Sequence, residues 1–222
     1  MSAEVIATGS GEHAEVTVTR VVTAGTFSLD GGTWDVENNV WIIGDASEVI
    51  VIDPAHDVER IAAALPSGAE VKAVLLTHGH DDHIREAVAA GERFGAPVYL
   101  PGADRMLWDA VHETAPAGTV ADGDTFEVAG VRLAALSTPG HTPGSTCYLV
   151  EELGLLFSGD TLFSGGPGAT SRSYSDFDTI IHSIRTRLLV LDPDTRVLTG
   201  HGDATSIGAE APHLQEWIDR GH

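Results

Sequence analysis

The chain has 222 residues, with 12 Lys or Arg against 33 Asp or Glu, which gives a formal net charge of −21 at pH 7. This length suits one sizeable domain, and 42% hydrophobic with 20% charged residues is the composition of a globular protein, not of a disordered or fibrous one. Because nucleic acids and anionic lipid surfaces are bound through cationic side chains, we expect neither nucleic acid nor membrane as a partner.

The N-terminal sequence and the cysteine content indicate where the protein works. The first residues, Met-Ser-Ala-Glu-Val-Ile-Ala, include an acidic residue where a secretory signal begins with basic ones. No uninterrupted run of about 18 apolar residues predicts a membrane span. We therefore expect a cytoplasmic protein. The single cysteine, Cys147, excludes an intrachain disulfide and a cysteine-rich zinc module, and its apolar neighbours predict an inert, buried thiol.

Hydrophobic periodicity predicts strands and helices that alternate along the chain. The expected strands are Val16–Val22, Asn39–Ile43, Glu48–Ile52, Val71–Leu76, Val98–Leu100, Phe126–Val128, Val131–Leu136, Thr146–Val150, Gly154–Phe157 and Val197–Leu198. The expected helices are Val58–Leu65, Ile84–Phe94, Ala103–Val111, Asp176–Leu189 and Ala211–Ile218. Since strand groups occur in both halves, we predict an α+β fold of two packed sheets with helices outside. It forms a single domain over residues 1–222, with residues 1–13 as a candidate loose tail.

The densest chemical signal is Thr-His-Gly-His-Asp-Asp-His over residues 77–83, directly after an apolar strand. Residues two apart in an extended segment point the same way, so His78 and His80 are placed to bind one ion together. The turn into the next helix then brings Asp82 and His83 to a neighbouring position. Imidazole nitrogens combined with a carboxylate suit zinc, iron or manganese rather than calcium.

Simpler interpretations compete with a metal site at several polar residues. A surface loop whose aspartates cap the next helix is the alternative for this motif, and for Asp81 we favour capping or solvent exposure. Solvent exposure is also the interpretation for the other histidines, which are His13, His56, His112, His182, His213 and His222. Packing in the core or on the surface is the interpretation for the tryptophans, which are Trp34, Trp41, Trp108 and Trp217.

Five motifs, in order along the chain, resemble those of the metallo-β-lactamase-fold hydrolases. They are Val-Ile-Asp-Pro around Asp53, His-x-His-x-Asp-His at residues 78–83, Thr-Pro-Gly-His-Thr-Pro-Gly around His141, Phe-Ser-Gly-Asp-Thr-Leu-Phe around Asp160, and Thr-Gly-His-Gly-Asp around His201. The similarity extends from Gly25 to Asp203. It implies a four-layer αββα sandwich with two divalent metal ions at one edge of the sheets.

The resemblance also implies a role for each motif. The residues that it assigns are His78, His80 and His141 to one metal ion, Asp82, His83 and His201 to the second, and Asp160 to both. Asp53 would brace the metal-binding loops without touching metal, and Asp82 would in addition orient the attacking water. Zinc is the metal that we expect, with iron and manganese as alternatives.

The leaving group points to a substrate class. Two divalent ions about 3.5–4 Å apart deprotonate a shared water near neutral pH, and the hydroxide attacks an electrophilic carbon. A thiol, with a pKa of about 8.5, leaves without a strong acid, whereas an amine needs a proton donor, and the sequence shows no dedicated one. The surroundings of His141 and Asp160 most resemble those of glyoxalase II (hydroxyacylglutathione hydrolase). We therefore predict hydrolysis of a small acyl-thiol.

The identity of the thiol stays open. The Gly-Cys-Gly-Arg segment that follows the bridging aspartate of glyoxalase II is replaced here by residues 166–172, and the region after His201 is short. Glutathione and mycothiol are both candidates. Arg172, Ser173 and Tyr174 are candidate substrate-binding residues, with a solvated loop as the alternative.

Two further activities share the same ligands. A mononuclear-iron persulfide dioxygenase of this fold would bind iron through the positions of His78, His141 and Asp160. A lactonase would use the dinuclear site on a cyclic ester. The sequence predicts neither the acyl group nor the oligomeric state.

Overall fold

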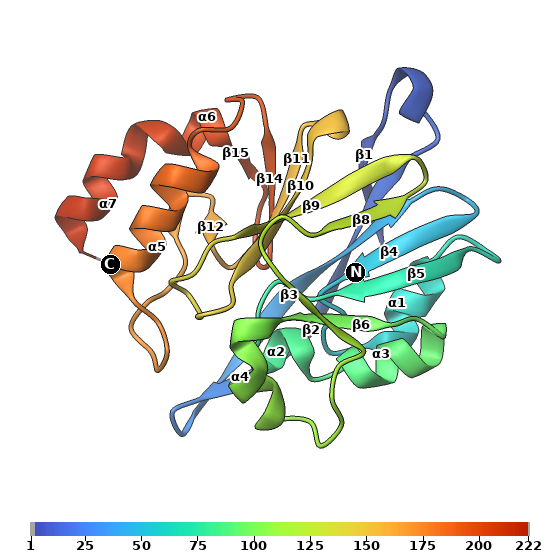
Figure 1. Ribbon diagram of the computed structural model, residues 1–222, viewed down its shortest axis with the longest axis horizontal. Helices are drawn as coiled ribbons and strands as arrows, with labels where there is room; N and C mark the ends of the chain where they lie inside the picture. The colour runs from blue at the N-terminus through green and yellow to red at the C-terminus, as the bar shows by residue number, and fades with distance from the viewer. Residues whose placement is uncertain (1–2, 222) are drawn as a thin grey trace.

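The computed structural model describes residues 3–221, which form four layers in the order helices, sheet, sheet, helices (Figure 1). The strands of the seven-stranded sheet are, in spatial order, β1 (Glu4–Thr8), β2 (Thr17–Leu29), β3 (Gly32–Gly44), β4 (Glu48–Ile52), β5 (Glu70–Leu75), β6 (Val98–Pro101) and β7 (Gly118–Val120). Those of the six-stranded sheet are β15 (Thr205–Ser206), β14 (Arg196–Thr199), β11 (Leu155–Gly159), β10 (Thr146–Val150), β9 (Val131–Ser137) and β8 (Thr125–Val128). A short ribbon of β12 (Leu162–Phe163) and β13 (Gly166–Pro167) stands apart.

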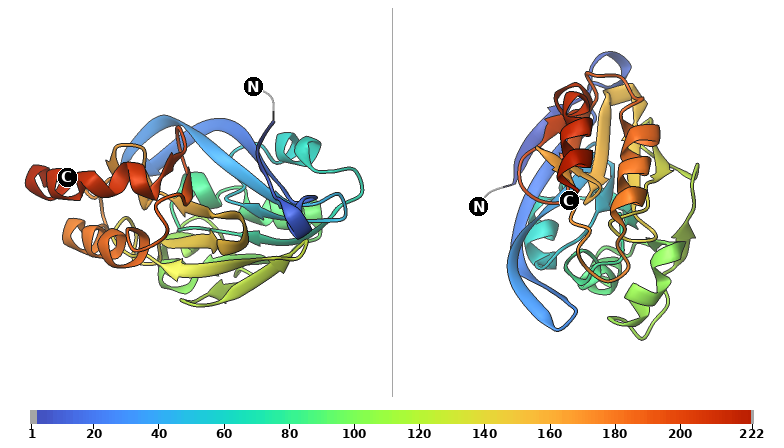
Figure 2. Two further views of the ribbon diagram at one scale, coloured as in Figure 1. Left: turned by 90° about the horizontal axis from the view of Figure 1, so that it is seen from above. Right: turned by 90° about the vertical axis from the view of Figure 1, so that its left-hand side faces the viewer.

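Helices cover the outer face of each sheet. The first sheet packs against α1 (Val58–Ala64), α2 (Asp81–Ile84), α3 (Ala87–Phe94) and α4 (Arg105–Asp109). The second sheet packs against α5 (Phe177–Ser183), α6 (Ile207–Glu210) and α7 (Leu214–Arg220). Figure 2 shows α5 and α7 side by side in the second group. The predicted α+β sandwich is confirmed.

Burial of strands on both faces explains their unbroken apolar runs. In β4, Ile50 and Ile52 face the core between the sheets, whereas Val49 and Val51 face the helices. In β10, likewise, Tyr148 and Val150 face the inner core while Cys147 and Leu149 face α5. Alternate side chains of a strand point to opposite faces, so a strand between two layers must be apolar at every position.

Four strands end at one edge of the sandwich. Parallel pairing joins β4 to β5 in the first sheet and β11 to β14 in the second. Parallel strands share the edge at which their carboxyl ends emerge, so the segments that follow them meet there. These segments begin at Asp53, Leu76, Asp160 and Gly200.

The β2–β3 hairpin is longer than the sequence pattern predicts. Its strands pair from Thr17 with Gly44 to Leu29 with Gly32, and only the stretch from Trp41 onward also pairs with β4. The distal half therefore projects past the sheet, as the blue arm at the lower left of Figure 1. A tight turn at Asp30 and Gly31, both with positive φ, closes the tip.

Three expectations are corrected. Residues 4–8 are not loose, because they form β1 and pair with β2 along the sheet edge. The single helix predicted over 84–94 is not continuous, because α2 ends at Ile84 and α3 begins at Ala87. The apolar spacing continues across this break and therefore does not indicate it. The predicted helix at 176–189 is α5, capped by Asp176, followed by a π-helical segment over 184–188. Within residues 3–221, no helix has the length and apolar character to cross a membrane.

Candidate metal centre

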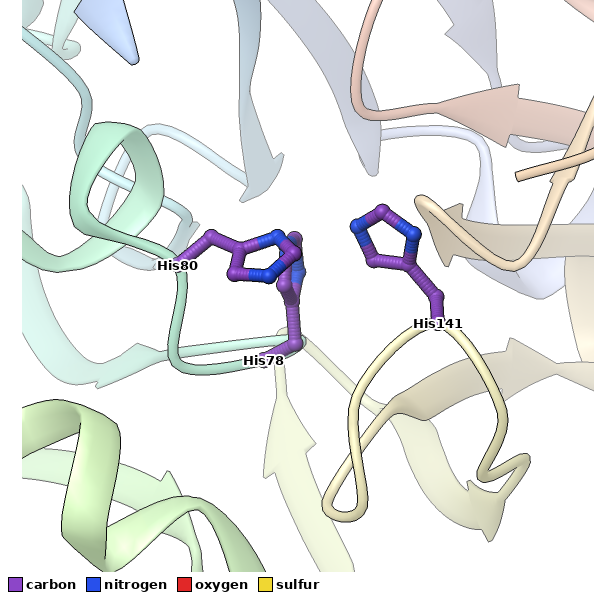
Figure 3. Close-up of side chains that lie close together, drawn as sticks. All are labelled: His78, His80 and His141. Atoms are coloured by element: carbon purple, nitrogen blue, oxygen red, sulfur yellow. The ribbon is translucent and has the colours of Figure 1, made fainter. Parts of the chain in front are cut away.

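Three histidines from two loops form the first group of the centre. His78 and His80 lie in the loop between β5 and α2, and His141 lies in the loop between β9 and β10. Figure 3 shows the three rings turned toward one another. The ring centroid of His141 is 4.5 Å from that of His80 and 5.0 Å from that of His78, and one nitrogen from each ring lies within 4.8 Å of the others. These are the three residues predicted for the first metal ion.

A carboxylate and two histidines form the second group. Asp82 and His83 lie in α2, where the short helix turns both side chains inward. His201 comes from the loop after β14, and its Nε2 is 3.4 Å from Oδ2 of Asp82 and 3.2 Å from Nε2 of His83. The second predicted set is thus also assembled in the structure.

Asp160 lies between the two groups. One of its oxygens is 3.5 Å from Nε2 of His83, and the other is 3.3 Å from Nε2 of His201 and 3.6 Å from Nε2 of His141. Its carboxylate therefore faces residues of both groups, which is the position that a ligand shared by two ions requires.

Unsatisfied polar atoms show that the centre is suited to metal. Among the described residues, Nε2 of His80, Nε2 of His141 and Oδ1 of Asp160 are buried and have no hydrogen-bond partner. Such atoms are rare in folded proteins, because burial without a partner costs about 1–3 kcal/mol each. Histidine nitrogens and carboxylate oxygens are ligands of zinc and iron. Cations bound at the centre would supply partners that such atoms lack within the protein.

In three of the histidines, the ring nitrogen that faces away from the centre, Nδ1, contacts an acceptor outside it. Nδ1 of His83 lies 2.9 Å from Asp53, and Nδ1 of His201 lies 2.7 Å from the carbonyl oxygen of Glu37. Nδ1 of His141 is likewise 2.8 Å from the carbonyl oxygen of Ala169. Contacts of this kind fix the tautomer and the orientation of metal-binding histidines. The imidazoles are therefore set to present Nε2 to the centre.

Burial favours the neutral form of the three rings in the first group. Burial lowers the pKa of His78 well below its ordinary value, and the neighbouring rings of His83 and His80 lower it further. Burial, together with His141, lowers the pKa of His80 to about 3. Burial also lowers the pKa of His141. A neutral imidazole keeps a lone pair for a metal ion.

The second group concentrates opposite charges. Burial alone would lower the pKa of His83 and His201, but Asp82 and Asp160 outweigh it and raise these pKa values to about 9 and about 11. Burial alone would raise the pKa of Asp82 and Asp160, but the histidines hold both well below the usual range. Divalent cations can replace protons as the positive partners of ionised carboxylates.

Asp53 braces two of these elements. Oδ1 accepts from the backbone N–H of Thr77 at 2.8 Å, and Oδ2 accepts from its hydroxyl at 2.6 Å and lies 2.9 Å from Nδ1 of His83. Both oxygens are therefore engaged outside the centre. This arrangement agrees with the bracing role that the resemblance implies.

Sequence reasoning did not find Asn38, a buried residue of β3 beside the second group. Its Nδ2 donates to Oδ2 of Asp82 at 3.0 Å, and its Oδ1 lies 2.8 Å from Nε2 of His56. His56 is half-buried, which corrects the expectation of solvent exposure. The usable signal was a pair of asparagines at 38–39 at the start of an apolar strand.

Asp104 was also missed, because it has no motif around it; it ends a short 3-10 helix (Gly102–Asp104) directly before α4. Its buried carboxylate accepts from the N–H of Gly79 at 2.7 Å, from the hydroxyl of Thr142 at 2.7 Å and from the N–H of Gly144 at 2.6 Å. Gly79 belongs to the loop of His78 and His80, and Thr142 and Gly144 to the loop of His141. Asp104 therefore ties together the two loops that form the first group.

A cavity of about 260 Å³ opens onto the centre. Its walls add Phe27 and Trp34 of the β2–β3 hairpin, Phe163, and Arg172 to residues of both groups. Trp34 is thus a cavity residue, 39% exposed, rather than only a packing one. The sequence did not predict the position of Trp34 at the cavity. That position depends on how far the hairpin projects past the sheet, which is set by where the pairing of β3 with β4 ends.

The three candidate substrate-binding residues have different positions. Arg172 lines the cavity. Ser173 does not, because its hydroxyl and N–H both donate to Asp30 at the hairpin tip. Tyr174 is 57% exposed and also lies outside the cavity lining. A role of Ser173 and Tyr174 in substrate binding therefore stays a prediction, and Arg172 is the candidate that lies in the cavity lining.

Two neighbouring residues also have defined positions. Asp81 neither caps α2 nor lies free in solvent, since it accepts from the N–H of Ser28 and forms an ion pair with Arg85. Cys147 is fully buried, and burial raises the pKa of its thiol to about 11. It is the inert thiol that the sequence predicts.

Comparison with known families decides the membership of the chain. The model of the metallo-beta-lactamase superfamily matches residues 33–201. The chain belongs to this superfamily. Superfamily membership confirms the resemblance on which the assignment of site residues was based.

Two relatives within the superfamily span most of the chain. It is 33% identical over 189 residues to hydroxyacylglutathione hydrolase GloC of Haemophilus influenzae, in an alignment that covers 78% of this chain and 89% of that protein. It is 40% identical over 207 residues to an uncharacterised protein of Mycobacterium tuberculosis, with the same coverage of 78% and 89%.

Solved structures of the superfamily share its fold. A di-iron-bound form of TTHA1623 matches with a TM-score of 0.71 and 29% identity, covering 86% of this chain and 97% of the other. ETHE1 from Myxococcus xanthus matches with a TM-score of 0.69 and 26% identity, covering 90% and 89%. Each of these two solved structures therefore matches this chain over most of its length.

Proposed function

We propose that the protein is a dinuclear metal-dependent hydrolase of small thioesters. The observation that carries the proposal is the position of Asp160, between two complete sets of ligand atoms and at the wall of a cavity. The similarity to hydroxyacylglutathione hydrolase GloC supports a thioester as the substrate.

The proposed ligand sets are those predicted from the sequence, namely His78, His80 and His141 for one ion, Asp82, His83 and His201 for the other, and Asp160 for both. When bound, the two ions would supply a water of lowered pKa and polarise the scissile carbonyl. The N/O ligand set suits zinc, which we propose, and the di-iron form of TTHA1623 keeps iron as the alternative.

Asp82 is the residue to which we assign an additional catalytic role. The amide of Asn38 donates to its Oδ2 and thereby fixes the plane of the carboxylate, and His56 fixes the amide in turn. A carboxylate held in this way is suited to orient the attacking water and to accept a hydrogen bond from it. Asn38 and His56 are then positioning residues for Asp82.

The cavity walls favour a leaving group that needs no proton. Apart from the proposed ligands, the described residues of the wall are aromatic or aliphatic side chains, Ser175 and Arg172. None of these is an acid of the strength needed to protonate an amine as it leaves. A thiolate needs no such donor, because the pKa of a thiol is about 8.5.

The test combines metal content with a substrate panel. Purified protein, loaded with zinc or with iron, is assayed on glutathione and mycothiol thioesters, on lactones, and for oxygen uptake with a thiol persulfide. We expect two metal ions per chain and thioester hydrolysis in preference to the other reactions. One iron per chain with oxygen uptake would identify a persulfide dioxygenase instead, and faster lactone cleavage a lactonase.

A further inference from the structure

A guanidinium group is stacked on an aromatic wall of the cavity. Cζ of Arg172 lies 3.7 Å from the ring centroid of Trp34 and 5.4 Å from that of Phe27. Stacking of this kind uses the flat face of the guanidinium. Its N–H donors lie in the plane, at the edge, where they remain available to a planar anion such as a carboxylate.

The segment that carries Arg172 is fastened on both sides. Ser173 donates twice to Asp30 at the hairpin tip, at 2.6 and 3.0 Å. Ser175 closes a local turn, since its hydroxyl donates to the carbonyl oxygen of Arg172 at 2.6 Å and accepts from its N–H at 3.2 Å. The guanidinium is therefore held in place before any ligand binds, which reduces the entropy lost on binding.

Arg172 forms no ion pair in the described part of the chain. The carboxylate of Asp30, whose pKa is lowered by the hydrogen bonds from Ser173 and to a lesser degree by Arg172, contacts Ser173 instead. Arg85, Arg93, Arg105 and Arg187 each form an ion pair with a carboxylate. Arg172 instead lies on apolar rings, partly buried, as the permanent cation among the residues that line the cavity. In a chain of net charge −21, a cation placed in this way favours an anionic ligand group.

The aromatic wall also connects this cation to the metal centre. The ring of Phe27 is 5.1 Å from the ring of His80 on one side and 5.4 Å from Cζ of Arg172 on the other. A single ring therefore separates the guanidinium from a proposed metal ligand. A small molecule whose reactive carbonyl lies at the metals would reach Arg172 with a group only a few bonds away.

We propose that Arg172, stacked on Trp34, binds a carboxylate of the substrate while the thioester lies at the metal centre. The inference rests on the proposed function and specifies it: the preferred thioesters carry a carboxylate a few bonds from the scissile carbonyl. That carboxylate belongs either to the acyl group or to the thiol. Trp34 acts as the positioning residue for the guanidinium.

The test uses substrates matched in all but charge. One pair is the succinyl thioester of N-acetylcysteamine and its terminal amide, which places the carboxylate on the acyl group. The other pair is the acetyl thioester of N-acetylcysteine and of its amide, which places it on the thiol. Steady-state kinetics are measured for the wild type, Arg172→Gln, Arg172→Lys and Trp34→Leu. The control is Arg132→Gln, which removes an exposed arginine on β9.

For the pair whose carboxylate is bound, Arg172→Gln should lower kcat/KM of the carboxylate substrate about 10–100-fold and that of its amide little. Arg172→Lys should retain part of the preference, because lysine keeps the charge but not the forked donors. Trp34→Leu should weaken the same preference, and Arg132→Gln should leave it unchanged. An equal loss for carboxylate and amide in both pairs would overturn the proposal.

Failure of the proposed function would give a different result from failure of the carboxylate subsite. If the metal-loaded wild type cleaves none of these thioesters, the hydrolase proposal fails and the subsite is tested by calorimetry. The probes are non-hydrolysable thioether analogues of the same pairs. Tighter binding of a carboxylate analogue by the wild type, lost in Arg172→Gln, would still support the subsite. Equal affinity for carboxylate and amide would overturn it.

Discussion

Replacing Asp104 by asparagine should destabilise the protein and loosen the metal centre together. The carboxylate accepts three hydrogen bonds, one on Oδ1 from Gly144 and two on Oδ2 from Gly79 and Thr142. An amide nitrogen in either position faces a backbone N–H. At least one buried donor therefore loses its acceptor, and the remaining bonds lose the help of the charge.

The expected loss follows from the number of bonds. A buried donor without an acceptor costs about 1–3 kcal/mol, and bonds to a charged group are worth more than neutral ones. We therefore expect Asp104→Asn to lower the free energy of unfolding by about 2–4 kcal/mol. The hydroxyl of Thr142 can turn to Oγ of Ser145, 2.9 Å away, which limits the cost.

The assay is urea unfolding of the metal-free protein, followed by tryptophan fluorescence, with Asp109→Asn as the control. Asp109 lies in the adjacent helix α4, and its carboxylate is 52% exposed and paired with Arg105. The loss of an exposed pair costs about 0–1 kcal/mol. Competition with a chromophoric chelator measures the second effect, a fall in metal affinity of about 10–100-fold in Asp104→Asn alone. Equal stability and equal metal affinity of the two variants would refute the bridging role of Asp104.

Four other outcomes are expected. Gly200→Ala should strongly reduce hydrolysis and metal content, because the added Cβ would lie 2.1 Å from Oδ1 of Asp160. Gly102→Ala is the control, since a Cβ there meets nothing closer than 3.6 Å. Normal turnover in Gly200→Ala would contradict this geometry. Asp160→Ala should abolish hydrolysis, and full turnover would exclude the shared-ligand role. Saturating metal, at about 100 times its Kd, should stabilise the metal-free protein by about 2.7 kcal/mol for each ion bound, a rise in Tm of about 5–10 °C per ion by scanning calorimetry. An unchanged Tm would count against metal binding. Since burial raises the thiol pKa of Cys147 to about 11, its thiolate fraction at pH 8 is small, and Ellman's reagent should label it only after unfolding.

The strands of the core were predictable because burial requires a local run of apolar residues in the sequence. A strand between two layers must be apolar on both faces, and β4 was predicted with the bounds that the structure has. Helix boundaries were less accurate, since the apolar spacing over 84–94 continues across the break between α2 and α3. Strand β1 was missed because its apolar run, Val5 to Ala7, has only three residues, none of which is fully buried at this sheet edge.

The sequence by itself determined which residue types meet at the proposed metal centre, because they stand in compact motifs directly after strands. Strand ends meet at one edge, so the motifs meet as well. Asp104, Asn38 and the cavity wall were decided only by tertiary structure. Ser173 contacts Asp30 across 143 positions of sequence, and no local pattern encodes such a distance. The length of the β2–β3 hairpin and the loop docked on its tip together bring Arg172 onto Trp34, a contact that exists only once both sheets are packed.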